Sequence, residues 1–357
     1  MGHLTEIARY DAAPAGDAVP VTIALEGGGS LGAFTWGVLE RLLDAPEVRI
    51  AAVSGASAGA MNAAMLAHGL AVSGPEEAKR LLEVFWRRVA GAAGSPDVDV
   101  ARWVMAPLRH LLAPVTDAVR REVLLHYSPT SLSPNPLRCV LDGLLDPAVF
   151  GGPDAPMLVV SATRVRTGEA RLFVDQEVTA DALLASACFP NLFPAVEIDG
   201  EPYWDGGYAS NPPLRPLIEA GAPPDVILVR TTPFERLEPP SGTGPIGTRV
   251  NEIAFSSALR GELRSLAVAQ RLLAEVPEVS GVTSRLREAR IHVISAENEF
   301  RSLPGGSKLD PSWGFLLQMR ELGHDAADAW LARHLPDLGH RSSFDLSEFA
   351  APGLHAS

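Results

Sequence analysis

The sequence predicts an α/β fold in which a mostly parallel central sheet lies between layers of helices. Two short apolar segments, residues 21–25 and 50–54, each end in a glycine-rich turn that leads into a helical stretch. This alternation is typical of parallel strands joined by crossover helices. A third apolar segment, 226–230, has the same buried-strand character. Because no repeat or linker divides the 357 residues, we expect one domain over residues 21–335.

The remaining elements follow from apolar segments separated by turn residues. Further strands are predicted at residues 157–165, 170–174, 195–198, 202–204 and 291–295, and helices at 32–43, 58–70, 247–276 and 312–334. Outside the regular elements we expect a flexible lead-in at residues 1–20, a surface loop at 233–246 and an irregular C-terminal tail at 336–357.

Residues 75–136 interrupt the alternation with helical, proline-punctuated sequence. The segment contains an apolar stretch from Trp103 to Leu112, and its charge over residues 76–135 is about +1 in an otherwise acidic chain. Two interpretations stay open. It is a helical layer that packs on the sheet, or a lid or membrane-facing cap that includes Met105 and Leu108.

Composition excludes several classes of function. The formal net charge of −13 argues against a nucleic-acid partner, whose binding surface should be basic. Cys139 and Cys188 form neither a disulfide framework nor a metal motif, and we predict no metal and no cofactor. Without a secretory signal or a long apolar span, the expected location is cytoplasmic. The sequence carries no sign of the oligomeric state.

The segment from Gly55 to Gly59 matches the nucleophile-elbow pattern G-x-S-x-G, with Ser57 at its centre. A tight strand-to-helix turn needs small residues on both flanks, and it presents the serine hydroxyl above the edge of the sheet. A plain glycine-rich turn would look the same in so short a motif. The position after one predicted strand and before a helix favours catalysis.

Gly27, Gly28 and Gly29 end the first predicted strand. Such a run lets backbone N–H groups turn toward an oxyanion or a phosphate. The spacing of Gly27, Gly29 and Gly32 also fits a dinucleotide-binding loop, but that loop requires an acidic residue at the end of the next strand. Ser54 and Gly55 occupy that place, so the nucleotide interpretation is rejected.

Asp205 precedes Gly206 and Gly207 and is followed by Asn211 and Pro212. Taken alone, Asp-Gly-Gly is an ordinary turn signal. A carboxylate before two glycines can, however, approach another backbone closely.

Together these motifs resemble the patatin-like phospholipase family. Its members combine a glycine-rich oxyanion loop, a G-x-S-x-G serine and a D-G-G or D-G-A aspartate, and the segment 185–190 is similar to the family's A-S-x-x-x-P stretch. The resemblance covers about residues 21–230. One departure is Leu31, which stands where many members have Arg or Lys after the glycines.

The resemblance implies a three-layer α/β/α sandwich and a serine acyl hydrolase of the lipase or phospholipase A type, active in lipid degradation. Ser57 would attack the ester carbonyl as the nucleophile and Asp205 would take its proton as the general base. Backbone N–H groups of Gly27, Gly28 and Gly29 would form the oxyanion hole. The implied partner is a lipid or another acyl ester, met in solution or during transient contact with a membrane surface.

Two rival functions stay open. An α/β-hydrolase with a Ser-His-Asp triad would need a late histidine, and the sequence offers His292, His324, His334, His340 and His355. None of these histidines stands in a distinctive motif. Ser57 also follows only two predicted strands, which is earlier than the usual position of the nucleophile in an α/β-hydrolase. The second rival is an acyltransferase or lipid-binding protein that uses the same pocket.

Overall fold

The computed structural model describes residues 18–94, 135–190, 192–304 and 306–350. Within them, an eight-stranded sheet has the order β5-β6-β3-β2-β1-β7-β8, and β4 pairs with β3. The strands are β1 (Val19–Leu25), β2 (Val48–Ala56), β3 (Met157–Arg164), β4 (Ala170–Val174), β5 (Val196–Ile198), β6 (Glu201–Asp205), β7 (Asp225–Val229) and β8 (Arg290–Ile294). Strands β3, β2, β1, β7 and β8 pair in parallel, which confirms the predicted class.

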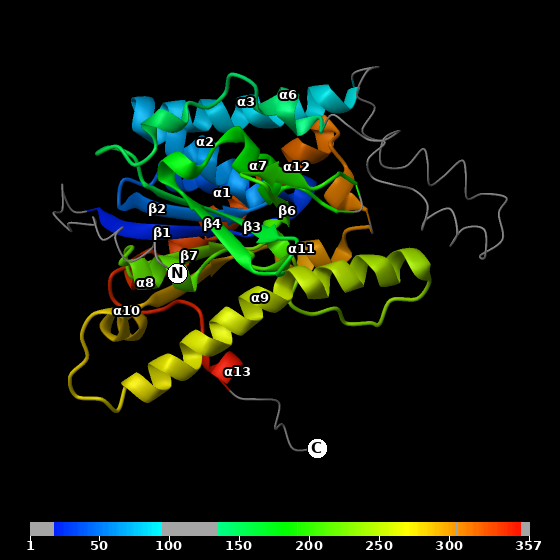
Figure 1. Ribbon diagram of the computed structural model, residues 1–357. Coiled ribbons are helices and arrows are strands. Elements are labelled where there is room, and N and C mark those ends of the chain that lie inside the picture. Colours follow the sequence, from blue (N-terminus) through cyan, green and yellow to red (C-terminus); the bar gives the residue numbers. More distant parts are fainter. Residues whose placement is uncertain (1–17, 95–134, 191, 305, 351–357) are drawn as a thin grey trace.

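Helices cover both faces of the sheet and make a three-layer α/β sandwich (Figure 1). One layer contains α1 (Gly32–Leu43), α2 (Ala58–Ser73), α3 (Pro75–Gly94), α6 (Leu137–Leu141), α7 (Ala180–Ser186) and α12 (Trp313–His334). The opposite layer contains α8 (Arg215–Ala220), α9 (Thr243–Leu273), α10 (Val282–Glu288) and α13 (Ser347–Ala350). The short helix α11 (Glu297–Ser302) follows β8.

The central strands are apolar throughout because both of their faces are buried. In β1, Ile23 and Leu25 join the core beneath α1 and α2, whereas Ala24 joins the core beneath α8 and α9. In β7, Val229 and Leu228 divide in the same way. Successive side chains of a strand point to opposite faces, so a parallel strand with helices on both sides needs a continuous apolar run.

The predicted helix at residues 247–276 begins earlier in the structure, since α9 starts at Thr243. Pro245 lies within its first turn, where the missing N–H of proline does no harm. The Pro- and Gly-rich segment therefore overlaps the helix start. Helices α10 and α11 were not predicted, because each is too short for a periodic pattern to stand out.

Helix α3 is the described part of the 75–136 segment up to Gly94, and it packs on α2. The apolar stretch from Trp103 to Leu112, with Met105 and Leu108, lies outside the described residues. Between α12 and residue 350 the described chain has only short helical turns, yet Leu338 and Leu346 are buried. Among the described residues, no helix is long and apolar enough to cross a membrane.

Candidate active site

Ser57 occupies a strained turn between β2 and α2. Its backbone has φ 54° and ψ −125°, a region that side-chain-bearing residues rarely adopt. Such strain costs on the order of 1–3 kcal/mol and persists where the surrounding packing enforces it. The turn directs the serine into a cavity at the carboxyl edge of the sheet, and Ser57 lines that cavity. The turn has the strand-to-helix geometry that the G-x-S-x-G pattern predicts.

The glycines on either side of Ser57 allow this turn because their backbones touch other backbone. A Cβ on Gly55 would lie 2.4 Å from the carbonyl carbon and oxygen of Gly59. A Cβ on Gly59 would lie 2.2 Å from the carbonyl oxygen of Leu25. No side chain fits at these distances, so the two motif glycines hold β2, α2 and the end of β1 together.

We expect Gly59→Ala to lower the stability of the protein by about 3 kcal/mol or more, because the Leu25 carbonyl belongs to a central strand that cannot move aside. Gly261→Ala is the matched control. Gly261 also lies within a helix, α9, but nothing stands within 4 Å of its added Cβ. That change should be neutral or should raise stability by up to about 1 kcal/mol. Thermal unfolding of both variants checks this; equal melting temperatures would contradict it.

Asp205 reaches Ser57 through the pairing of β3. Strand β2 pairs with β3 up to Ala56 opposite Ser161, and β6 pairs with the next residue, Ala162, through Asp205. Strand β4 pairs with the same part of β3, so β2 and β6 must share its other edge. The end of β2 and the end of β6 therefore meet, although they are distant in the sequence.

The Asp205 carboxyl group is buried, with 2% of the residue exposed. Its Oδ1 accepts a hydrogen bond from the Gly207 N–H at 2.8 Å. Burial raises the pKa of Asp205 to about 7, although the Gly207 N–H, the neighbouring Ser57 side chain and the charge of Lys308 act in the opposite direction. A carboxylate with this pKa can take a proton near neutral pH.

The segment 185–190 accepts hydrogen bonds from the backbone N–H groups of both Ser57 and Asp205. The Ser57 N–H donates to the Ser186 Oγ at 2.9 Å, and the Asp205 N–H donates to the Cys188 carbonyl at 2.8 Å. The Thr163 hydroxyl donates to the Asp205 carbonyl at 2.8 Å. The family resemblance indicates this segment but gives no role to Ser186. Only the folded structure shows that the Ser186 hydroxyl accepts a hydrogen bond from the Ser57 N–H.

The three glycines after β1 are not equivalent. The Gly27 N–H donates to the Asn211 Oδ1 at 2.7 Å and is therefore not free for a ligand. Gly28 and Gly29 line the cavity, and within the described residues their N–H groups have no hydrogen-bond acceptor. Gly29 has φ +59°, and a Cβ there would meet the Lys308 carbonyl oxygen at 2.2 Å. Asn211, close to the Asp-Gly-Gly motif in the sequence, thus anchors the loop.

A buried glutamate lies under the same loop. The Glu26 Oε2 accepts from the N–H groups of Thr231 and Thr232 at 2.7 and 2.9 Å. Burial raises the pKa of Glu26, and the nearby charges of Arg230 and Lys308 oppose that rise. Glu26 thereby ties the end of β1 to the residues after β7. In the sequence, Glu26 is a single acidic residue after a predicted strand, and nothing there indicates its contact with Thr231 and Thr232.

The cavity in front of Ser57 and Asp205 has a volume of about 350 Å³ and is mainly apolar. Helices α2, α3 and α6 form one wall, and an aromatic group that includes Phe189 and Phe255 forms another. The larger apolar side chains along the walls are those of Met61, Phe85, Trp86, Val89, Leu137, Val140, Phe189, Leu192, Phe193, Phe255 and Leu309. A pocket of this character suits an acyl chain.

No histidine lines this cavity among the described residues. His292 is buried elsewhere against Asp225 and Ser343, His334 contacts Asp337, and His324 lies near Asp328. His340 does not line the cavity, and His355 lies outside the described residues. The described chain also contains no group of three or more His, Cys, Asp or Glu residues that could hold a metal ion.

A mixed, mostly parallel sheet between two helical layers, with a serine on a strained strand-to-helix turn, defines a three-layer α/β protein. A family model described as "Patatin-like phospholipase" matches residues 23–218. The chain belongs to the patatin-like phospholipase family and has its fold. Membership supports a lipid acyl hydrolase activity on ester bonds.

Two further comparisons concern solved structures and curated sequences. Among solved structures, the chain is similar to that of VipD from Legionella pneumophila, with 18% identity and a TM-score of 0.40. The similarity covers 90% of this chain and 68% of VipD. No curated protein sequence matches the chain.

Proposed function

We propose that this protein cleaves fatty-acyl ester bonds of lipids through a dyad of Ser57 and Asp205, without a histidine. The observation that carries the proposal is that Ser57 and the buried Asp205 carboxyl group line the same apolar cavity, close enough for the Ser57 side chain to affect the pKa of Asp205. A general base must lie within hydrogen-bond reach of the proton that it removes and must have a pKa near the working pH. Asp205 meets both conditions.

The proposed reaction has two steps. Asp205 takes the proton from the Ser57 hydroxyl as its Oγ attacks the ester carbonyl, and the leaving alcohol then receives that proton from Asp205. Water next attacks the acyl-enzyme and gives its proton to the same carboxylate. As the bond between the acyl group and the Ser57 Oγ breaks, Asp205 returns this proton to the Oγ, and the fatty acid leaves with the free Ser57 hydroxyl restored.

Backbone N–H groups of Gly28 and Gly29 are the proposed donors to the oxyanion that forms in both steps. They line the cavity beside Ser57 and have no acceptor within the described residues, whereas Asn211 engages the Gly27 N–H. Gly27 would then support the loop rather than bind the oxyanion. One oxyanion donor typically contributes about 2.7–4 kcal/mol of transition-state stabilisation.

A lipid panel tests this function. Wild-type protein is incubated with phospholipids, lysophospholipids, glycerides and a short soluble ester, and released fatty acid is measured. We expect release from at least one long-chain lipid. Adding an alcohol acceptor distinguishes hydrolysis from acyl transfer, because a transferase would form mainly the new ester. Binding without release of fatty acid or formation of ester would leave only a lipid-binding protein.

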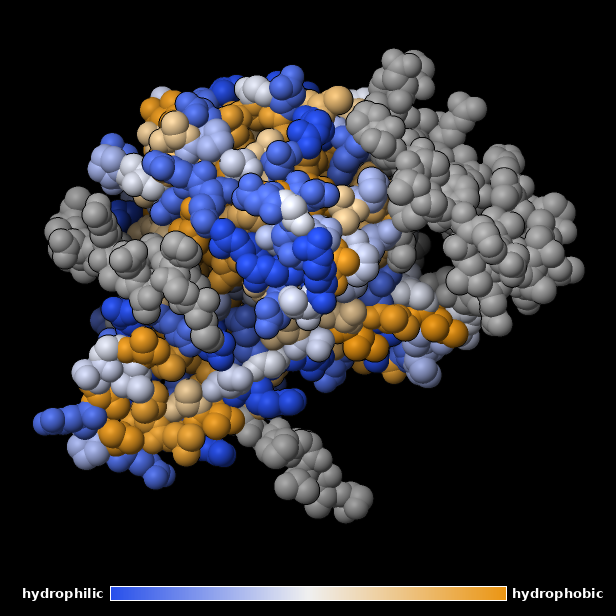
Figure 2. Space-filling model, viewed as in Figure 1, coloured by the Kyte–Doolittle hydropathy of each residue, from blue (hydrophilic) through white to orange (hydrophobic). Residues whose placement is uncertain are grey.

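We also propose that the protein is located in the cytoplasm and that it contacts lipid surfaces transiently. On α9, Ile246, Val250 and Ile253 form one stripe at helical spacing and are 48, 58 and 53% exposed. Figure 2 shows apolar side chains gathered over this part of α9. Neighbouring positions of the helix, Thr248 and Asn251, line the cavity, so the stripe adjoins the place where a lipid would enter.

We expect the double variant Val250→Glu, Ile253→Glu to bind phosphatidylcholine vesicles less and to act more slowly on them, because two charges would enter the lipid interface. Hydrolysis of a short soluble ester should stay within about twofold. Leu272→Glu is the control, since Leu272 is 62% exposed at the other end of α9. Vesicle co-sedimentation and fatty-acid release measure both effects; equal losses in the two variants would contradict this surface.

A further inference from the structure

A second cavity of about 190 Å³ lies beside the apolar one. The two share Thr248, Gly306 and Lys308 as lining residues. The second cavity is many times larger than the roughly 10–15 Å³ that a single water molecule requires. It therefore has room for a small polar group attached to a molecule that occupies the apolar cavity.

The charges of the second cavity differ from those of the whole protein. Its described lining contains the cations Arg236, Arg249 and Lys308 and the anions Glu238 and Glu252, a balance of +1 in a chain whose net charge is −13. Lys308 is one of only two lysines in the sequence. The second cavity therefore has a small positive charge, whereas the chain as a whole is strongly negative.

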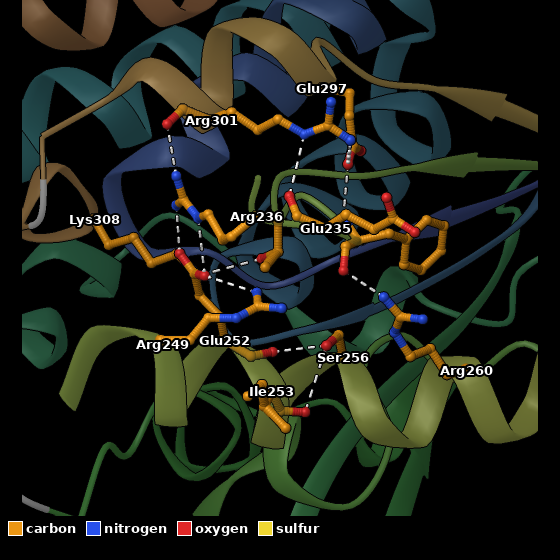
Figure 3. Close-up of polar contacts among 12 residues, drawn as sticks. Glu235, Arg236, Arg249, Glu252, Ile253, Ser256, Arg260, Glu297, Arg301 and Lys308 are labelled. Atoms are coloured by element: carbon orange, nitrogen blue, oxygen red, sulfur yellow. Dashed lines mark hydrogen bonds and ion pairs between the residues drawn. The ribbon is translucent and has the colours of Figure 1, made fainter. Parts of the chain in front are cut away.

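A buried glutamate holds the two arginines in place. Arg236 donates to both carboxylate oxygens of Glu252, at 2.6 and 3.2 Å, and the Arg249 Nη1 donates to Oε2 at 3.1 Å (Figure 3). Burial acts to raise the pKa of Glu252, but the bonds from both arginines outweigh it and hold that pKa below its ordinary value. Glu252 is therefore an anion, and a single carboxylate faces two guanidinium groups.

The arginines keep capacity for a further anion. Their side chains are 26 and 23% exposed, while that of Glu252 is 3% exposed. Within the described residues, Arg249 uses only Nη1 in a hydrogen bond, so Nε and Nη2 remain as donors. Guanidinium groups suit phosphate because their N–H groups match its oxygens in pairs.

Lys308 connects the two cavities. Its Nζ donates to the Thr232 Oγ1 at 3.2 Å, and its backbone carbonyl packs against Gly29. Burial lowers the pKa of the Lys308 ammonium, and the charges of Glu26, Glu252 and Asp205 counteract that effect. A bound anion would stabilise the charged form of Lys308 in the same way as these carboxylates do. The cation therefore lies between the glycine loop and the arginines.

We propose that the cavity of Arg236, Arg249 and Lys308 binds the phosphate of a phospholipid whose acyl chain lies in the apolar cavity and whose ester faces Ser57. The proposal rests on the function proposed above and adds the substrate class: phosphate-bearing lipids are preferred over neutral glycerides with the same chains. Arg249 is the residue to test, because Arg236 has the larger part in holding buried Glu252.

The experiment compares dihexanoyl phosphatidic acid with dihexanoylglycerol, both below the concentration at which they aggregate. Binding is measured by calorimetry on Ser57→Ala, so that no hydrolysis is needed. We expect Arg249→Gln in this background to weaken phosphatidic acid binding about tenfold or more and to change glyceride binding less than twofold. Arg264→Gln is the control, an exposed cation of α9 outside both cavities that should change neither.

The outcomes separate the alternatives. Equal losses for both lipids, or no preference of the parent for phosphatidic acid, would overturn the subsite. A third arm measures inorganic phosphate: if it binds as tightly as phosphatidic acid, the cavity is a free-phosphate site and the lipid assignment is wrong. The proposed hydrolase function is judged separately, by fatty-acid release in the wild type, where Arg249→Gln should raise KM for phosphatidic acid and leave kcat nearly unchanged.

Discussion

Replacing Ser57 by alanine is expected to reduce ester hydrolysis by about 10⁴-fold or more, because no other group can form the acyl-enzyme. The fold should survive. The substitution removes one half-buried hydroxyl, and the Ser57 backbone bond to Ser186 is kept. Alanine at this position keeps the strained φ of 54°, so the backbone strain is the same in the variant and the wild type. The melting temperature should therefore stay close to that of the wild type.

Fatty-acid release, thermal unfolding and labelling by a fluorophosphonate probe check this together. The probe should label wild-type protein and fail to label Ser57→Ala. Ser265→Ala, which removes an exposed hydroxyl of α9 outside both cavities, is the control and should behave like the wild type. Retained activity in a folded Ser57→Ala, or labelling at another serine, would move the active site elsewhere.

Replacing Asp205 by asparagine is expected to lower kcat/KM by about 10³-fold or more, because the amide is nearly isosteric but cannot take the Ser57 proton. The residual rate would come from the oxyanion donors and substrate binding alone. In the wild type, kcat/KM should fall about tenfold per pH unit below about pH 7, where Asp205 becomes protonated. A wild-type profile that is flat from pH 8 to pH 5 would contradict Asp205 as the base.

The same variant should be more stable than the wild type at pH 8. The pKa of Asp205 is raised from 3.8 to about 7 in the folded protein, so the folded state binds this proton more tightly than the unfolded state does. The stability that this proton gives is fully present below pH 3.8 and is lost as the pH rises through 7. The ionised, buried carboxylate then costs up to about 4 kcal/mol.

Asparagine is neutral at every pH, so the gain in melting temperature of Asp205→Asn should be larger at pH 8 than at pH 5. Asp142→Asn, an exposed aspartate outside both cavities, should show no such difference. A variant that is less stable at both pH values would mean that the bond between the carboxylate and the Gly207 N–H matters more than the buried charge.

Local sequence determined the strands and the elbow. Continuous apolar runs such as residues 21–25 can be buried on both faces only in a parallel sheet between helices, and the structure has them there. The small residues of Gly55 to Gly59 likewise specify a tight turn by sterics that operate within a few residues. Asp205 stood out only because its motif joined two others in a family pattern.

Only the tertiary structure decided how the site is assembled. The pairing of β2 and β6 with consecutive residues of β3 brings Ser57 to Asp205. Burial, which depends on packing from several elements, raises the pKa of that aspartate. The bond from Gly27 to Asn211 spans 184 positions, and Lys308 reaches the glycine loop from near the C-terminus. A sequence records which groups a chain carries; distances between groups far apart along it are set by strand register and packing, and these set the chemistry.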